Sequence, residues 1–356
     1  MPAQPRILWI DFCRVYAAFF VIVRHTERYS GSINFFADLF NYRSLIFFFF
    51  LMAGYFTHRM REGQWIDFRR IGHLLWPFLF WAVVATLLLV PLLNREALAA
   101  GDFSCISWEV LKDECGLKRW VYYSFSNVPL WFMRTLLIIT LFSGLLQRIP
   151  SRMMVPLILI IFAASDVLCH ADVECAEKQH RTDGVEWLPY RLYESVLAAG
   201  FYCLGLLLRR HADPAKLTAW LSEYAWAPVI GSLVLLPIVY HTHFNPPIMS
   251  SALVLLGTAT IMSIGCLCQR CLPRFCRFVA AWGPAAFFVY VTHYILLKFF
   301  MVALTGNYRG IITRTEALWV PFAILLFSLG LFVLLRRLFP NFMRVIALTG
   351  DKPGKP

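Results

Sequence analysis

The feature that most constrains this chain is a succession of long apolar segments separated by short polar ones. A helix needs roughly 20 mostly apolar residues to cross a bilayer. Only 15% of the 356 residues are charged, against about 25% in an ordinary globular domain. These properties exclude a soluble enzyme, a disordered chain and a disulfide scaffold. The expected membrane spans are 7–24, 44–56, 72–93, 128–147, 153–169, 190–208, 226–240, 248–268, 279–303 and 317–335.

The sequence therefore predicts an all-α polytopic membrane protein with about ten transmembrane helices. Residues 1–349 are expected to form one integral membrane domain, and residues 350–356 a disordered tail. The segments that connect the spans are short and leave no room for a soluble catalytic domain. Any chemistry is expected inside the helical bundle or at its rims.

The distribution of charge predicts the orientation of the chain. If the N-terminus is cytoplasmic, the inner loops hold 18 basic and 5 acidic residues, whereas the outer loops hold 10 basic and 13 acidic residues. Basic residues concentrate in cytoplasmic loops, so both termini are predicted to be cytoplasmic. The net charge of +12 is thereby explained by topology, and no nucleic-acid partner is expected.

Two groups of cysteines lie in different predicted compartments. The outer four can pair in three ways, most simply as 105–115 and 169–175, and the sequence does not choose among them. The inner four follow a C-x-C-x2-C-x4-C spacing that differs from standard zinc sites, so no metal is predicted there. Free thiols are favoured, with lipidation as an alternative. The outer group is Cys105, Cys115, Cys169 and Cys175, and the inner group is Cys266, Cys268, Cys271 and Cys276.

The first span carries a stripe of polar residues. Arg14 and His25 are eleven positions apart, so they point within roughly 20° of each other on a helix, separated by about 16 Å along its axis. Asp11 precedes Arg14 by three residues and can pair with it. Charged groups inside a membrane are costly and are functional candidates. The alternative is a structural Asp11–Arg14 pair with His25 reaching the membrane interface.

Three further groups of residues are candidates for a functional site, and each also has a structural interpretation. Tyr290 and His293 share a helix face, although a lone histidine in an aromatic helix is more often a core residue. Trp131 and Arg134 also share a face, although an arginine near a helix end can extend to the interface. Basic residues at the start of the third span offer an anion site, although they also suit positive-inside anchoring. These last residues are Arg69, Arg70 and His73.

Together these segments resemble motifs of membrane acyltransferase family 3, whose members O-acylate extracytoplasmic glycans and related acceptors. The first span resembles the family's Arg-x10-His motif, with Arg14 and His25 at its ends. The other matching segments are the aromatic run 47–55, the basic segment 68–77, the Leu-Trp-Phe/Tyr element at 129–132 and the Tyr-x-x-His segment at 283–293.

The chain departs from the family's motifs at three positions. Ala53 and Phe287, or its neighbour Ala286, stand where the family has serine, so no hydroxyl is present there. His73 replaces the second arginine of the basic segment. Phosphate binding would therefore depend more on Arg69 and Arg70.

The resemblance implies an acyltransferase that moves an acyl group other than an aminoacyl group. The donor would be acyl-CoA, most often acetyl-CoA, acting as a co-substrate with no permanently bound cofactor. His25, Arg14 and His293 would be catalytic, with His25 as general base or as the carrier of a transient acyl-imidazole. Arg69, Arg70 and His73 would bind the donor's phosphates. Substrate binding would fall to Asp11, Trp131, Arg134 and Tyr290.

The expected partners are acyl-CoA, membrane lipid and a glycan or lipid-linked sugar acceptor outside the cytoplasm. Family frequency favours a bacterial inner membrane. The competing interpretation is a transporter or flippase, because intramembrane charges serve transport equally well. The sequence does not identify the acceptor, the acyl group or the oligomeric state.

Overall fold

The computed structural model describes residues 6–27, 29–30, 42–58, 60, 63–104, 130–179, 192–242, 249–308 and 310–347. Within these ranges the chain is helical and has no strand, as predicted. The helices fall into two compact units that interleave in sequence. Unit 1 comprises Met1–Ala17, Phe35–Asp67 and Ile138–Ala281, and unit 2 comprises Ala18–Asn34, Phe68–Leu137 and Trp282–Pro356.

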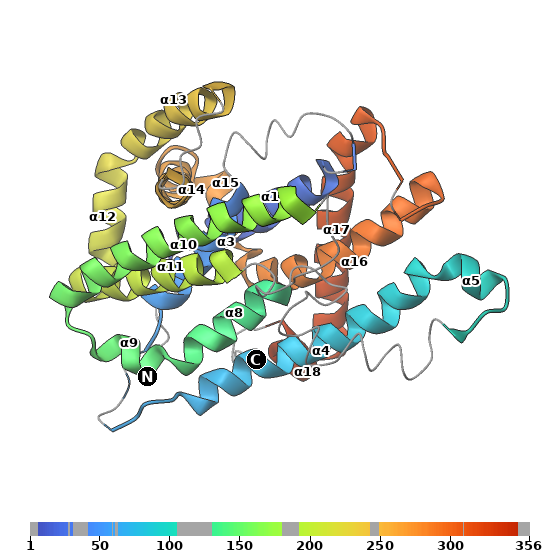
Figure 1. Ribbon diagram of the computed structural model, residues 1–356, viewed down its shortest axis with the longest axis horizontal. Helices are drawn as coiled ribbons and strands as arrows, with labels where there is room; N and C mark the ends of the chain where they lie inside the picture. Colours follow the sequence, from blue (N-terminus) through green and yellow to red (C-terminus); the bar gives the residue numbers. More distant parts are fainter. Residues whose placement is uncertain are drawn as a thin grey trace. The chain divides into compact units, whose positions relative to one another are not determined.

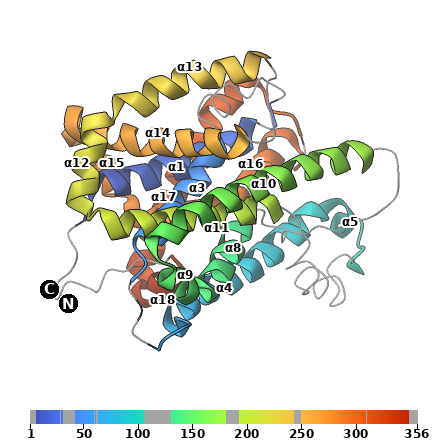
Figure 2. The same ribbon diagram turned by 60° about the vertical axis from the view of Figure 1, so that its left-hand side comes forward.

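The first helix, α1 (Leu8–Glu27), contributes its first half to unit 1 and its second half to unit 2. The other helices of unit 1 are α3 (Tyr42–Tyr55), α9 (Ser143–Arg148), α10 (Ser151–Gln179), α11 (Leu192–His211), α12 (Pro214–Tyr224), α13 (Trp226–Thr242), α14 (Met249–Cys271) and α15 (Pro273–Ala280). Figures 1 and 2 both show α10 running beside α11, and Figure 2 shows α13 running beside α14.

Unit 2 contains α4 (Phe68–Leu93), α5 (Arg95–Ala99), most of α8 (Leu130–Leu141), the 3-10 turn η2 (Gly283–Ala285), α16 (Ala286–Thr305), α17 (Arg314–Leu338) and α18 (Pro340–Ile346). The Trp81 indole on α4 donates to the Ile346 carbonyl of α18 at 2.9 Å. Its ring also meets Phe288 of α16, with centroids 5.5 Å apart. Phe288 in turn meets Phe332 of α17. These buried rings join four helices of unit 2 and fix the position of α16.

Six of the described helical stretches are long and apolar enough to cross a membrane. Three shorter apolar helices, at Arg43–Tyr55, Leu130–Leu141 and Trp226–Leu235, also coincide with predicted spans. Every predicted span overlaps a helix, but the count of ten crossings and the cytoplasmic termini stay predictions. The tail 350–356 lies outside the described residues, as do Cys105 and Cys115.

The predicted span 128–147 differs in form from the structure. The segment expected as a continuous helix over 128–147 is broken at Phe142 into α8 and α9. Ser143 donates its hydroxyl to the Thr140 carbonyl at 2.7 Å, which competes with regular helical bonding. Gly144 lies against the Trp65 carbonyl, where a β-carbon would not fit. The break therefore allows the chain to approach the Trp65 backbone in unit 1.

The simplest disulfide pairing is also incompatible with the structure at one of its bridges. Cys169 and Cys175 both lie on α10, six residues and about 9 Å apart along the helix axis. A disulfide requires α-carbons closer than about 7 Å. The described thiol of Cys169 is free, so the 169–175 pairing is wrong while α10 stays helical.

Candidate active site

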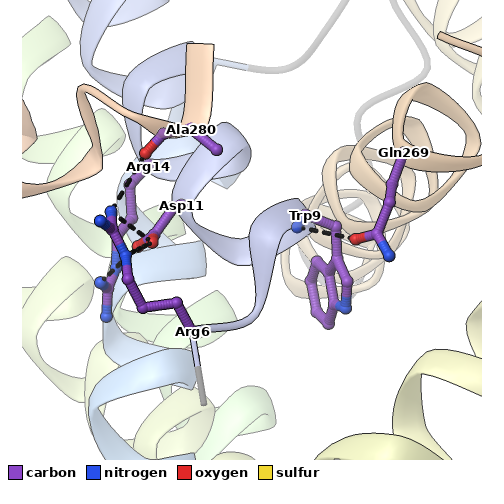
Figure 3. Close-up of polar contacts among 6 residues, drawn as sticks. All are labelled: Arg6, Trp9, Asp11, Arg14, Gln269 and Ala280. Atoms are coloured by element: carbon purple, nitrogen blue, oxygen red, sulfur yellow. Dashed lines mark hydrogen bonds and ion pairs between the residues drawn. The ribbon is translucent and has the colours of Figure 1, made fainter. Parts of the chain in front are cut away.

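The polar stripe of α1 begins with an ion-pair cluster in unit 1. Asp11 is 7% exposed, and its two carboxylate oxygens contact different guanidinium groups. Oδ1 accepts from Arg14 Nη1 at 3.0 Å, as the three-residue spacing predicted. Oδ2 accepts from Arg6 Nε at 3.0 Å and lies 2.9 Å from Arg6 Nη2. Figure 3 shows the carboxylate between the two arginines.

Arg6 is the member of this cluster that sequence reasoning missed. Its Nη2 also donates to the Ala280 carbonyl at the end of α15, at 3.2 Å. The start of α1 is further fixed by Trp9, whose backbone N–H donates to Gln269 Oε1 at 3.0 Å (Figure 3). The buried Trp9 indole donates to the Thr218 hydroxyl at 2.9 Å. Arg14 thus projects from a rigid helix end, and its side chain stays 39% exposed.

The other half of α1 brings His25 to His293 in unit 2. The two imidazole rings lie with centroids 5.2 Å apart, although the residues are 268 positions apart in sequence. His25 also meets the Tyr294 ring edge-on at 5.7 Å. His25 is therefore packed among aromatic rings of α16, and the two histidines predicted to be catalytic are neighbours.

The geometry of His293 fixes which of its nitrogens can accept a proton. Its ring is fully buried, and Nδ1 lies 2.6 Å from the Tyr290 carbonyl oxygen. A carbonyl only accepts hydrogen bonds, so Nδ1 carries the proton of the neutral ring. Nε2 then has a free lone pair, and it has no hydrogen-bond partner among the described residues. A buried acceptor without a donor is costly, unless a ligand supplies the donor.

Tyr290 and α8 form the next layer around the histidines. The Tyr290 ring lies 5.8 Å from His293 and 5.4 Å from Phe132 of α8. Trp131 and Arg134, on the same helix as Phe132, are both buried. Arg134 is 5% exposed, so its side chain is enclosed by other residues of the protein. Sequence reasoning missed Phe132 and Tyr294, although both adjoin predicted site residues.

The start of α16 helps to place His293. Trp282 precedes the 3-10 turn η2, which has Pro284 in its first turn, where proline's missing N–H costs nothing. The turn runs directly into α16. His293 follows after two helical turns, on the segment that Phe288 anchors to α4 and α17. A rigid helix therefore carries the buried imidazole.

The three basic residues predicted to bind donor phosphates lie in the first two turns of α4. Arg69 and His73 are exposed, and Arg70 is half-buried. The N-terminus of a helix presents free N–H groups and a positive dipole end. Side chains and helix end thus give this part of unit 2 the chemistry of an anion site.

The inner cysteines lie together in unit 1. Cys13 of α1 donates to the Ile261 carbonyl of α14 at 3.2 Å, and the Gly265 backbone packs against its sulfur. Cys13, Cys266, Cys268, Cys271 and Cys276 are all free thiols. Within the part of the chain that the structure describes, no group of three or more histidine, cysteine or acidic residues is placed to hold a metal ion.

Comparison with known proteins gives one match. A family model described as an acyltransferase domain matches residues 7–337, nearly the whole chain. No curated protein matches the chain, and no solved structure does. The matched range contains every site residue that the sequence predicted, and Arg6 directly precedes it.

Proposed function

The chain belongs to acyltransferase family 3, and we propose that this integral membrane protein transfers an acyl group from cytoplasmic acyl-CoA to a hydroxyl outside the cytoplasm. Acetyl is the proposed acyl group, and a glycan or lipid-linked sugar is the proposed acceptor. The observation that carries the proposal is the pair formed by His25 and the buried His293, whose Nε2 has no hydrogen-bond partner among the residues that the structure describes. The proposed location is a bacterial inner membrane.

Acyl transfer to a hydroxyl needs a base for one proton. In the proposed reaction His25 takes the proton of the acceptor hydroxyl as that oxygen attacks the thioester carbonyl. A C–O bond forms, the C–S bond breaks, and the imidazolium returns the proton to the departing thiolate. His293 Nε2 accepts a hydrogen bond from the acceptor and so orients it. The bond from Nδ1 to the Tyr290 carbonyl keeps Nε2 in the accepting form.

The tetrahedral intermediate needs donors for its oxyanion. In unit 2, Arg134 and the hydroxyl of Tyr290 have the required chemistry, and both lie on helices that contact each other through Phe132 and Tyr290. Arg69, Arg70 and His73 would hold the anionic phosphates of the donor.

The first prediction separates the two histidines. Radiolabelled acetyl-CoA is added to membranes that express the wild type or a variant, and transfer of label to extractable glycan is measured. His25→Ala removes the base, so the rate should fall about 10²- to 10⁴-fold. His293→Asn can keep the donor near the Tyr290 carbonyl but loses the acceptor at Nε2. It should therefore raise KM for the acceptor as well as lower kcat.

The control for this experiment is His293→Gln, whose amide oxygen can replace the acceptor at Nε2 and should restore part of the activity. Detergent-extracted protein is checked for folding by its elution profile. If the wild type and His25→Ala transfer label equally, His25 is not the base. If no label moves from either an acetyl or a succinyl donor, acyl transfer is wrong and transport becomes the favoured function.

A further inference from the structure

A buried lysine in unit 2 is surrounded by tyrosine rings. Lys298 of α16 is 6% exposed, and its ammonium lies 4.8 Å from the centroid of the Tyr29 ring, 5.4 Å from Tyr294 and 5.3 Å from Tyr308. It donates to the Tyr29 hydroxyl at 2.6 Å and to the Tyr308 carbonyl at 3.3 Å. Three aromatic faces and two oxygens thus surround one cation.

The charge of Lys298 has no anionic partner in the part of the chain that the structure describes. None of the described carboxylates forms an ion pair with it. Ring quadrupoles, a phenol and a carbonyl stabilise an ammonium only partly, and an uncompensated charge inside a membrane is costly. An ammonium has three N–H donors, and the two hydrogen bonds leave one of them available.

Lys298 is separated from the histidine pair by a single ring. Tyr294 contacts the Lys298 ammonium on the one side and the His25 ring at 5.7 Å on the other. All three residues belong to unit 2. An acceptor whose hydroxyl reaches His25 therefore has a cation close to its neighbouring substituents.

A purely structural role is the main alternative. Through its hydrogen bonds to Tyr29 and Tyr308, Lys298 also joins the segment after α1 to the segment between α16 and α17. The same two segments are joined by the Ile312 N–H, which donates to the Tyr29 carbonyl at 2.9 Å. Such a link needs hydrogen-bond donors and does not need a net charge. The two roles can therefore be separated by a neutral side chain that still donates.

We propose that Lys298 binds an anionic substituent, a carboxylate or a phosphate, on the acyl acceptor. The identity of the ligand as an acceptor rests on the function proposed above, whereas the preference for an anion does not. The anion can belong to an acidic sugar or to the phosphate of a lipid. In both cases the ammonium supplies a charge-assisted hydrogen bond that a neutral acceptor would not form.

The second prediction concerns thermal stability without any acyl donor. Purified full-length protein in a neutral detergent is titrated with glucuronate, glucose or inorganic phosphate at matched ionic strength, with chloride as the reference. A ligand that binds only the folded state raises Tm. Glucuronate or phosphate should raise the Tm of the wild type by about 3 °C near saturation, and glucose should not.

Three variants distinguish anion binding by the charge of Lys298 from a purely structural role of its hydrogen bonds. Lys298→Gln loses the charge but keeps an amide that can donate to the two oxygens, so it should lose the anion-dependent shift. Lys298→Arg should keep the shift. Tyr29→Phe removes the phenol that accepts the 2.6 Å bond but keeps the ammonium, so its basal Tm should fall while the shift remains.

The same variants identify the source of the anion. In vesicles of phosphatidylcholine, the Tm of the wild type and that of Lys298→Gln should respond differently only when an acidic sugar is added. A difference between wild type and Lys298→Gln that requires phosphatidylglycerol instead would assign the anion to a lipid phosphate. An anion shift that survives in Lys298→Gln, or no shift in the wild type, would overturn the proposal. Loss of acyl transfer bears on the proposed function alone, because the stability readout needs no catalysis.

Discussion

Asp11 holds two guanidinium groups at once, which makes it more costly to replace than either arginine. Asp11→Asn leaves Arg6 and Arg14 without their anion, whereas Arg6→Gln leaves the Asp11–Arg14 contact in place. Charge-assisted hydrogen bonds contribute about 1.5–3 kcal/mol when buried, and the exposure of both arginines reduces that value. We expect Asp11→Asn to lower Tm clearly more than Arg6→Gln, as measured by thermal unfolding in detergent.

A double-mutant cycle between Asp11 and Arg6 checks this prediction. Independent effects of the two substitutions would contradict the shared-carboxylate geometry. At this scale the sequence predicted the Asp11–Arg14 pair, because three residues on a helix fix that neighbourhood. It did not predict Arg6, because Arg6 also depends on the Ala280 carbonyl, 274 residues away.

Helices α3 and α11 pack closely through glycines, and this contact gives a fourth substitution test. A β-carbon on Gly54 would overlap the Tyr202 carbonyl, and one on Gly205 would overlap the Leu51 carbonyl. Small residues allow such close approach between membrane helices. Gly54→Ala should therefore destabilise the protein by about 1–3 kcal/mol through overpacking, measured as a lower Tm in detergent.

The matched control for Gly54 is Gly330 on α17, which has nothing within 4 Å of the position of an added β-carbon. Gly330→Ala should be neutral or stabilising, since alanine favours a helix by up to about 1 kcal/mol over glycine. Equal losses of stability in both variants would show that helix packing does not explain the effect at Gly54.

At the scale of elements, apolar length predicted where helices occur but not where they are interrupted. The break at Phe142 depends on Ser143 and on the distant Trp65 backbone. The short helices α12 and α18 lie in segments expected as loops. In α12 the Asp213 side chain caps the first turn by accepting from the Lys216 N–H at 2.8 Å, a local signal that a search for apolar spans does not use.

For the whole molecule, the sequence placed His25 and His293 in the same site only through a family resemblance. Their contact joins the ends of the chain across 268 positions, and helix periodicity carries no information about such a distance. Helix periodicity also does not predict the three tyrosine rings around Lys298, because Tyr29 and Tyr308 come from segments that are far apart in the sequence. Local sequence patterns identified individual candidate residues, but tertiary packing determines which of them lie together.

The last prediction concerns the membrane topology of the chain, that is, on which side of the membrane each loop lies. Cys271 is an exposed free thiol at the end of α14, on the predicted cytoplasmic side. Ser104 is exposed after α5, on the predicted outer side. A membrane-impermeant maleimide is applied to intact cells that express Ser104→Cys, with the four predicted outer cysteines, Cys105, Cys115, Cys169 and Cys175, replaced by serine. Position 104 should react at once, and Cys271 only after permeabilisation, because basic loops are retained inside.

The two labels also test the number of crossings between them. Five predicted spans separate position 104 from Cys271, and an odd number places the two thiols on opposite sides. Labels on the same side would require an even number and would make the ten-span prediction wrong between these positions. Opposite sides with the reverse reactivity would keep an odd number of crossings but invert both termini. In that case the basic segment at Arg69 and Arg70 would face away from cytoplasmic acyl-CoA, and the proposed donor site would fail with it.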